Sequence, residues 1–490
     1  MPDDHSVSAP RPPRSRPGDP GDPSGPAAPG RTSAPRGAAL AVLCLVQFLL
    51  VLDDTVVSVA LPSIREDLAF GTAGLVWVVN AYFLAFGGLL LLCGRLSDLL
   101  GRRRVFLTGV ALFGAASLLC GLAREPWQLV TGRFAQGAGA AMASPAALAM
   151  VALLYPEPGE RARAFGIWGA VAGLGGTLGV VVSGALTGLA SWRWVFLVNL
   201  PVVLVAVTLL PRLVRESRAD RPPRLDVPGA VLGTGAVVAL VYGLLRAGEA
   251  GWTDRTAVPA LALAGALAAG FGWWERRTAQ PLLPSSYLAS RFRLVANGAS
   301  LLLSAALYAM AFLLMLQVQT VLGYRPLTAG LAYLPYGAAI LTGLWLSRRA
   351  VARFGMRTAL TGSLLVTAAG LLTLSGVAAG DGYVSGVLPG MLVTALGCGL
   401  SLPALTVAAL TGTTGEDAGI GSAVLNSVQQ IGGAVGLAVL VPLAARGHGT
   451  EAAGGFSLAL TVAAGVVALG AVALLALPGG PGRGHAAAGR

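Results

Sequence analysis

The chain is divided into fourteen apolar runs, and each run is long enough to cross a lipid bilayer. A membrane-spanning helix needs about 20 mostly apolar residues. Only 11% of the residues are charged, whereas soluble globular proteins carry about 25%. The runs do not show the strict alternation of a lipid-facing barrel strand. The sequence therefore predicts an all-α integral membrane protein with fourteen transmembrane helices.

The expected spans follow one another closely along the chain, and their even number places both termini on the same side of the membrane. The first 37 residues are polar and rich in proline, without the apolar segment of a signal peptide, so they are predicted to form a disordered cytoplasmic tail. The predicted spans lie near 38–62, 73–93, 104–123, 127–154, 164–189, 194–211, 227–246, 256–274, 295–322, 327–347, 357–378, 384–411, 418–445 and 455–477.

The distribution of arginine supports this topology. All 34 basic residues are Arg, and 26 of them fall in the segments that the topology places inside, against six in the outside loops. Short basic loops stay in the cytoplasm, so both termini are expected to be cytoplasmic in a cell (plasma) membrane. The absence of lysine, with the excess of Ala and Gly, indicates a GC-rich bacterial genome.

An internal echo suggests how the spans are grouped. The segment 353–357 follows the tenth span and is similar to 99–103, which follows the second span. The two segments are therefore eight spans apart, whereas a chain of two six-helix halves alone would place them six spans apart. Parallel repeats are common in secondary transporters. We therefore expect two six-helix bundles with two inserted helices between them. The predicted parts are 1–37 (tail), 38–211 (N-terminal bundle), 212–226 (linker), 227–276 (inserted helices), 277–294 (loop), 295–477 (C-terminal bundle) and 478–490 (cytoplasmic tail).

A short turn dense in charge separates the second and third runs. Residues 94–104 read GRLSDLLGRRR, and this pattern resembles the signature loop of the major facilitator superfamily of secondary transporters. The resemblance implies a gating role, in which Asp98 and Arg102 or Arg103 hold the cytoplasmic ends of spans two and three, and a neighbouring helix, in the outward-facing state. The expected gating residues are Gly94, Asp98, Gly101, Arg102 and Arg103.

The first span contains two adjacent carboxylates. Residues 52–62 read LDDTVVSVALP, which is similar to a pattern of the fourteen-span drug:proton antiporter branch, with Asp53 on the family aspartate and Ser58 where Asn is usual. Acids within a membrane are expensive and mark functional sites by default. The resemblance favours Asp53 as the proton carrier, whereas helical periodicity favours Asp54, which shares a stripe with Gln47 and Ser58. A structural, hydrated role at the outer interface is the alternative for both acids.

The fourth span carries an arginine well inside the membrane. Residues 133–141 read RFAQGAGAA and resemble another pattern of the same branch. An unpaired guanidinium at this depth is costly, so Arg133 is expected to have a carboxylate or carbonyl partner, with Asp53 or Asp54 as the available acids. The alternative is a structural salt bridge without a role in transport.

Other stretches resemble the branch to different degrees. The fifth span has Val180 and Ser183 where the antiporter pattern has Pro and Gly, which weakens the case for antiport, whereas WRWVFLVNLP from Trp192 matches the branch closely. Polar residues in the spans are candidates for a substrate cavity, although packing or interhelical bonding would also explain them. The expected cavity residues are Gln47, Ser58, Gln136, Gln317, Tyr336, Asn426 and Gln430.

The resemblance and the lack of enzyme motifs together define the functional expectation. The chain shows no nucleotide-binding loop and no metal-spaced His or Cys residues, so neither an enzyme nor a metal site is predicted. Despite the net charge of +12, the arginines are spread over loops, which argues against nucleic acid as a partner. We expect a monomer in the lipid bilayer that exports hydrophobic small molecules in exchange for protons, with no cofactor besides the proton gradient. A nutrient importer or facilitator, and a membrane sensor without flux, are the alternatives.

Overall fold

The computed structural model describes residues 34–218, 225–283, 287, 289–377, 382–411, 417–445 and 452–476. Within these ranges every regular element is helical, and fourteen segments are long and apolar enough to cross a membrane. The predicted all-helical class and the number of spans are confirmed. The tails predicted at 1–37 and 478–490 lie outside the described residues, except for 34–37, which belong to the first helix.

The first six spans are formed by seven helices, because the sixth span is interrupted at Val198. Pro201 lies in the first turn of the helix that follows, where its missing N–H is tolerated and where it prevents a continuous hydrogen-bond ladder. The helices are α1 (Ala34–Asp67), α2 (Thr72–Leu100), α3 (Arg102–Gly121), α4 (Pro126–Leu154), α5 (Pro158–Leu189), α6 (Trp194–Leu197) and α7 (Asn199–Leu213).

The remaining spans include a second interruption, at Tyr333, which again precedes a proline in a first helical turn, Pro335. One span begins with a short π-helix, η1 (Tyr383–Val387). The other elements are α8 (Val227–Ala250), α9 (Ala257–Glu275), α11 (Arg291–Thr320), α12 (Pro326–Ala332), α13 (Leu334–Phe354), α14 (Met356–Ser375), α15 (Leu388–Leu410), α16 (Asp417–Ala444) and α17 (Ala452–Ala476).

The predicted turn at 94–104 is much shorter than expected. Helix α2 continues to Leu100 and α3 begins at Arg102, which leaves Gly101 alone between them. Gly101 has a φ of 113°, a backbone conformation that glycine adopts without a steric penalty. Of the gating residues predicted on a loop, Gly94 and Asp98 therefore lie in the last turns of α2, and Arg102 and Arg103 lie in the first turn of α3. Gly101 alone lies between the helices.

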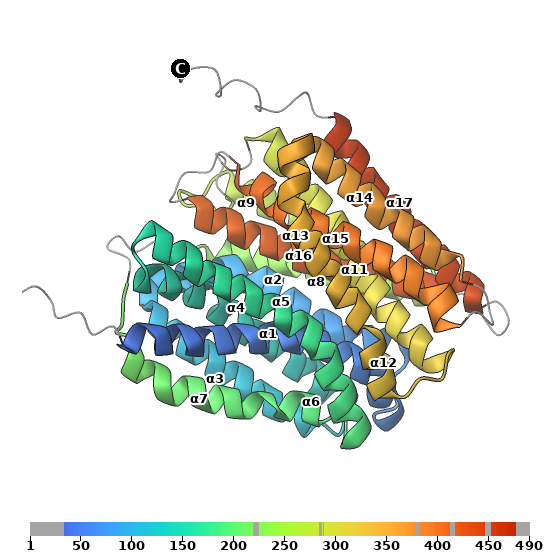
Figure 1. Cartoon of the computed structure of the whole chain (residues 1–490), viewed down its shortest axis with the longest axis horizontal. Helices are drawn as coiled ribbons and strands as arrows, with labels where there is room; N and C mark the ends of the chain where they lie inside the picture. The colour runs from blue at the N-terminus through green and yellow to red at the C-terminus, as the bar shows by residue number, and fades with distance from the viewer. Residues whose placement is uncertain are drawn as a thin grey trace, which may run out of the picture.

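The buried apolar side chains form two clusters that correspond to the two halves of the chain. The larger cluster is centred on α1 to α4 and includes residues from α7, α8 and α16, and the second is centred on α11, α14, α15 and α17. Helices α8 and α9 pack together, and α8 contacts both α2 and α16 (Figure 1). The inserted pair thus lies beside the seam where the two halves meet.

The two halves are in close contact where α5 meets α12. A Cβ atom added to Gly184 of α5 would lie 2.5 Å from the carbonyl oxygen of Pro326 in α12, and Figure 1 shows α12 against this end of α5. Toward the other end of α5, added Cβ atoms on Gly166, Gly169 and Gly173 would meet nothing within 4 Å. The two halves are therefore in close contact near Pro326, whereas these three positions of α5 have no neighbour within 4 Å.

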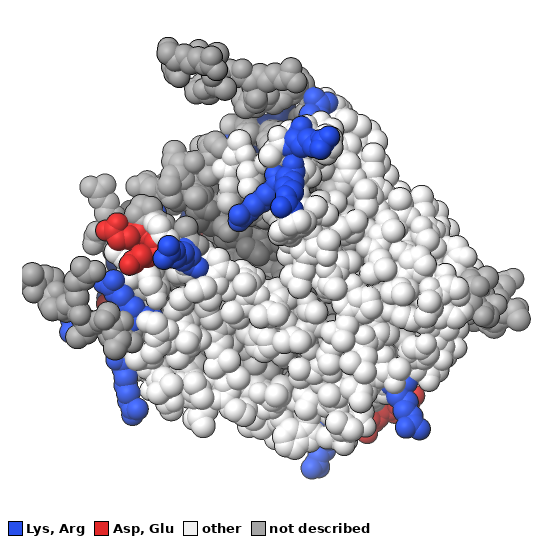
Figure 2. Space-filling view, viewed as in Figure 1, with Lys and Arg blue, Asp and Glu red and all other residues white. Residues whose placement is uncertain are grey.

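The charged side chains mark the two ends of the molecule. Figure 2 shows a broad band without charge between them. This band matches the apolar helix segments that a bilayer would cover. Such a distribution is typical of a multi-pass membrane protein.

Candidate functional site

A buried ion pair joins α1 to α4 inside the N-terminal half. Nη1 of Arg133 lies 2.5 Å from Oδ2 of Asp53, and the exposed fractions of the two side chains are 1% and 0%. Arg133 also donates from Nε to the carbonyl oxygen of Val78, at 3.0 Å. Asp53 is thus the acid that compensates Arg133, a choice that the sequence left open between Asp53 and Asp54.

The other carboxylate oxygen of Asp53 accepts two amide hydrogen bonds. Nε2 of Gln136 lies 3.1 Å from Oδ1, and Nδ2 of Asn199 lies 2.9 Å from the same atom. Both amides also donate to the hydroxyl of Ser117 in α3. Three donors from α4 and α7 therefore hold Asp53 in place.

Aromatic rings enclose the guanidinium of Arg133. Its Cζ atom lies 4.5 Å from the ring centroid of Tyr82 and 5.9 Å from that of Phe196. These rings exclude water and add cation–π attraction. The sequence analysis did not identify Asn199, Ser117 or Tyr82 as members of this site. For Asn199 a signal existed, since it is the one amide within the motif that begins at Trp192.

The second acid of α1 points in a different direction, toward the C-terminal half. The hydroxyl of Tyr308 in α11 donates to Oδ2 of Asp54 at 3.0 Å. The other oxygen, Oδ1, is buried and has no hydrogen-bond partner among the described residues. A full turn of helix is 3.6 residues, so neighbouring positions point about 100° apart. For this reason the adjacent acids have entirely different surroundings.

The side chain of Tyr308, in α11, packs against three other helices. Its ring packs edge-on against Phe83 of α2, with the centroids 4.6 Å apart. A Cβ atom added to Gly433 of α16 would lie 2.7 Å from the Tyr308 ring. The bond to Asp54 therefore forms where α1, α2, α11 and α16 converge between the halves.

The predicted cavity residues do not all lie together. Gln47 in α1 and Gln430 in α16 each have a buried amide oxygen without a partner among the described residues, as expected for groups that await a ligand or water. Asn426 is exposed and donates to the carbonyl oxygen of Ser422 in its own helix. The half-buried remainder are Ser58 in α1, Gln317 in α11 and Tyr336 in α13.

One predicted cavity residue lies elsewhere. Gln136 is fully buried within the N-terminal half, where it bonds to Asp53, Arg133 and Ser117. Its helical position turns it toward α1 and α3 instead of toward the other half. The prediction that Gln136 lines a substrate cavity is therefore wrong, and Gln136 belongs to the ion-pair network.

The predicted gating residues contact each other and the end of α7. Asp98 accepts from Nε and Nη2 of Arg102, at 3.0 and 2.8 Å. Nη1 of Arg103 donates to the carbonyl oxygens of Pro211 and Val214, at 3.3 and 3.0 Å. In this conformation these bonds lie within the N-terminal half.

Glu216, which the sequence analysis did not single out, completes the turn. Its carboxylate oxygens accept from the backbone N–H groups of Arg103 and Arg104, each at 3.1 Å. These N–H groups lie at the start of α3, where negative charge is favourable. A Cβ atom on Gly101 would lie 2.6 Å from Oε1 of Glu216, so glycine is needed for space as well as for its backbone conformation.

The start of the motif has a different role. A Cβ atom added to Gly94 would meet Pro145 at 3.8 Å, an ordinary contact. The neighbouring Arg95 donates from Nη1 to the carbonyl oxygen of Gln280, at 2.7 Å, and from Nη2 to that of Pro281. Arg95 thus ties α2 to the segment that follows the inserted helices.

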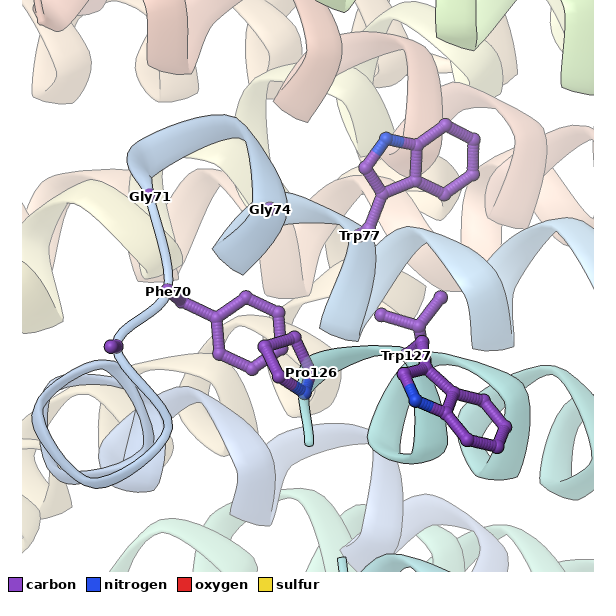
Figure 3. Close-up of a pocket in the computed structure, with 8 residues that line it drawn as sticks. Phe70, Gly71, Gly74, Trp77, Pro126 and Trp127 are labelled. Carbon is purple, nitrogen blue, oxygen red and sulfur yellow. The ribbon is translucent and has the colours of Figure 1, made fainter. Parts of the chain in front are cut away.

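A separate surface notch lies away from these groups. It has a volume of about 400 Å³ and lies between the α1–α2 turn and the start of α4. Figure 3 shows Phe70, Trp77, Pro126 and Trp127 around it. None of the predicted site residues lines this notch. No cluster of three or more metal-binding side chains occurs in the described ranges.

Comparison with known proteins places the chain in a family of membrane transporters. A sequence profile of the Major Facilitator Superfamily matches residues 43–437, and the chain belongs to this family. It is 39% identical over 455 residues to the puromycin resistance protein pur8 of Streptomyces alboniger, covering 88% of this chain and 89% of that protein. It is 40% identical over 435 residues to the cephamycin export protein CmcT of Amycolatopsis lactamdurans, covering 86% and 88%.

Solved structures support the fold. The peptide transporter POT in complex with sulfate superposes with a TM-score of 0.66 at 16% identity, covering 89% of this chain and 94% of the other. The family, the fourteen spans and these similarities agree with the sequence resemblance to the fourteen-span branch.

Proposed function

We propose that this protein exports hydrophobic small molecules across the plasma membrane in exchange for protons, by alternating access. The observation that carries the proposal is the position of Asp54, whose carboxylate lies between the two halves and has one oxygen without a partner among the described residues. Relatives that match most of the chain are named for resistance to puromycin and export of cephamycin. The motif matches of spans one, four and six support the same function.

The two acids have different roles in this proposal. Asp54 carries the proton, because its carboxylate lies where α1 meets α11 of the other half and its Oδ1 atom has no hydrogen-bond partner among the described residues. Asp53 holds α1 against α4 and α7, because Arg133 and two amides donate to its carboxylate. Resemblance alone favours Asp53 as the carrier, so the geometry and the motif lead to different assignments.

The conformation indicates the direction of access. The Gly101 turn and the other arginine-rich segments lie at the cytoplasmic surface by the positive-inside rule, so both termini are cytoplasmic. In this proposal the contact of Gly184 with Pro326 closes the outer side, and the pathway opens toward the cytoplasm. In this state substrate would enter from the cytoplasm or the inner leaflet and a proton would leave Asp54. A single chain holds the whole pathway, so a monomer suffices.

The test uses inverted membrane vesicles with an imposed pH gradient and puromycin or ethidium as the transported probe. Wild-type protein should accumulate the probe against its gradient, and addition of the probe to purified protein should release protons. Asp54→Asn should abolish both effects, whereas Asp53→Asn should leave proton release per folded molecule intact. Uphill transport by Asp54→Asn would contradict the assignment of the carrier, and accumulation in the opposite direction would identify an importer.

A further inference from the structure

We propose that Tyr308 is a positioning residue that prevents the empty, deprotonated transporter from changing its direction of access. The inference rests on the proposed function, because it takes Asp54 as the proton carrier. Tyr308 donates to Asp54 across the two halves of the chain, from α11 to α1, at 3.0 Å. No other described cross-half hydrogen bond ends on a carboxylate; those of Asn80 and Gln319 end on backbone carbonyl oxygens.

The strength of this bond depends on the protonation state of Asp54. A hydrogen bond to a carboxylate is roughly twice as strong as one to a neutral acceptor. When a proton binds the free Oδ1 atom, Oδ2 becomes a neutral carbonyl oxygen and the bond to Tyr308 weakens. The hydrogen bond between the halves is therefore strong when Asp54 is deprotonated and weak when Asp54 carries its proton.

The surroundings make Tyr308 suitable for this role. Phe83 and Gly433 fix the ring from α2 and α16, so the hydroxyl has little freedom to find another acceptor. The other titratable or charged groups near the pair are Asp53 in α1, Arg133 in α4, Tyr82 in α2 and Cys398 in α15. Arg133 is occupied by Asp53, which leaves Tyr308 as the donor that senses Asp54.

An exchanger needs such a restraint. If the empty carrier can reorient both with and without its proton, it conducts protons without moving substrate. The Tyr308 bond restrains the deprotonated form in the inward-open state, while the protonated form is freer to move. The net strength of a hydrogen bond to a charged group corresponds to a shift of about tenfold or more in the ratio of the two access states of the deprotonated transporter.

The experiment measures proton leak in proteoliposomes that contain the full-length protein, a trapped pH-sensitive dye and an imposed pH gradient, without substrate. Wild-type vesicles should hold the gradient. Tyr308→Phe should leak protons about tenfold faster while still transporting probe down its gradient. Tyr333→Phe is the matched control, because its hydroxyl donates to the carbonyl oxygen of Ala311 within the C-terminal half, and it should stay tight.

A double variant separates the possible failures. Tyr308→Phe combined with Asp54→Asn should lose the leak, since the proton carrier is gone, and thermal melting of each variant checks that it is folded. If Tyr308→Phe holds the gradient like the wild type while Asp54→Asn abolishes coupled efflux, the role of Tyr308 is overturned and the proposed function stands. If Asp54→Asn retains coupled efflux, the carrier assignment fails instead.

Discussion

Arg133 and Asp53 form an ion pair of 2.5 Å that joins α4 to α1, with at most 1% of either side chain exposed. A buried pair of this kind contributes little net stability compared with apolar residues, but removal of one partner leaves an uncompensated charge in the interior. The pair therefore fixes how α1 and α4 pack, and through α1 it fixes the direction in which Asp54 points.

The first prediction concerns the stability of this pair. Asp53→Asn should lower the free energy of unfolding by about 3–5 kcal/mol, because the Arg133 charge would stay buried without its partner. The double variant Asp53→Asn, Arg133→Gln should be more stable than the single variant. Thermal melting in detergent measures the stability of both variants. Asp54→Asn is the control, because Asp54 is not the ion-pair partner of Arg133 and its removal leaves the Arg133–Asp53 pair intact. Equal melting temperatures for the single and double variants would contradict the prediction.

The second prediction concerns the turn between α2 and α3. Gly101→Ala should destabilise the protein by two effects: backbone strain at a φ of 113° and contact with Glu216. Gly355 provides a matched control, since it lies in the turn between α13 and α14 with a φ of 79° and has open space around it. Gly355→Ala should therefore show the strain alone, of about 1–3 kcal/mol.

The difference between these two variants isolates the Glu216 contact. In a Glu216→Ala background, the cost of Gly101→Ala should fall toward that of Gly355→Ala. Melting temperature and vesicle transport are the measurements. If Gly101→Ala and Gly355→Ala have the same effect in both backgrounds, the Glu216 carboxylate does not account for the glycine at position 101.

The sequence was sufficient for features that depend on local pattern. The apolar runs predicted the number of spans, and the similarity of 99–103 to 353–357 predicted two six-helix bundles with two inserted helices. Both segments have a glycine in the left-handed region, Gly101 and Gly355. The cost of an unpaired guanidinium in the membrane predicted that Arg133 would have a carbonyl or carboxylate partner, and it has both.

Features that depend on helix rotation and on distant contacts were out of reach. The choice between Asp53 and Asp54 as the partner of Arg133 is settled by the rotation of α1 about its axis, which no motif encodes. Tyr308 lies 254 positions from Asp54 along the chain, and the contact exists only because two halves pack together. Gln136 was predicted to line a cavity because amides often do so, but its side chain lies on the face of α4 that packs toward α1, where it bonds to Asp53.

The third prediction concerns the closed end of the molecule. Gly184→Val should push α5 away from the backbone of α12, because an added Cβ already lies 2.5 Å from the Pro326 carbonyl oxygen. The population should shift away from the state in which α5 and α12 are in contact. A single cysteine at Leu327, in a background with the four native cysteines replaced by serine, should then react faster with a charged maleimide.

Gly169→Val on the same helix is the control for the third prediction, since an added Cβ there meets nothing within 4 Å. It adds the same side chain to α5 without approaching α12. The maleimide reactivity of Leu327→Cys should stay at its original rate in this background. Equal acceleration by both valine substitutions would show that the effect comes from α5 itself and not from the contact with Pro326.

The fourth prediction concerns Asp98. In this state Asp98 bonds only with Arg102 among the described residues, and 37% of its side chain is exposed, so the pair contributes about 0–1 kcal/mol. Asp98→Asn should therefore leave expression and melting temperature unchanged. Turnover should be lost, because Asp98 is expected to hold the ends of α2 and α3 and a neighbouring helix together in the outward-facing state. Glu160→Gln, at an exposed acid in the first turn of α5, should transport normally. Wild-type flux in Asp98→Asn would exclude a gating role.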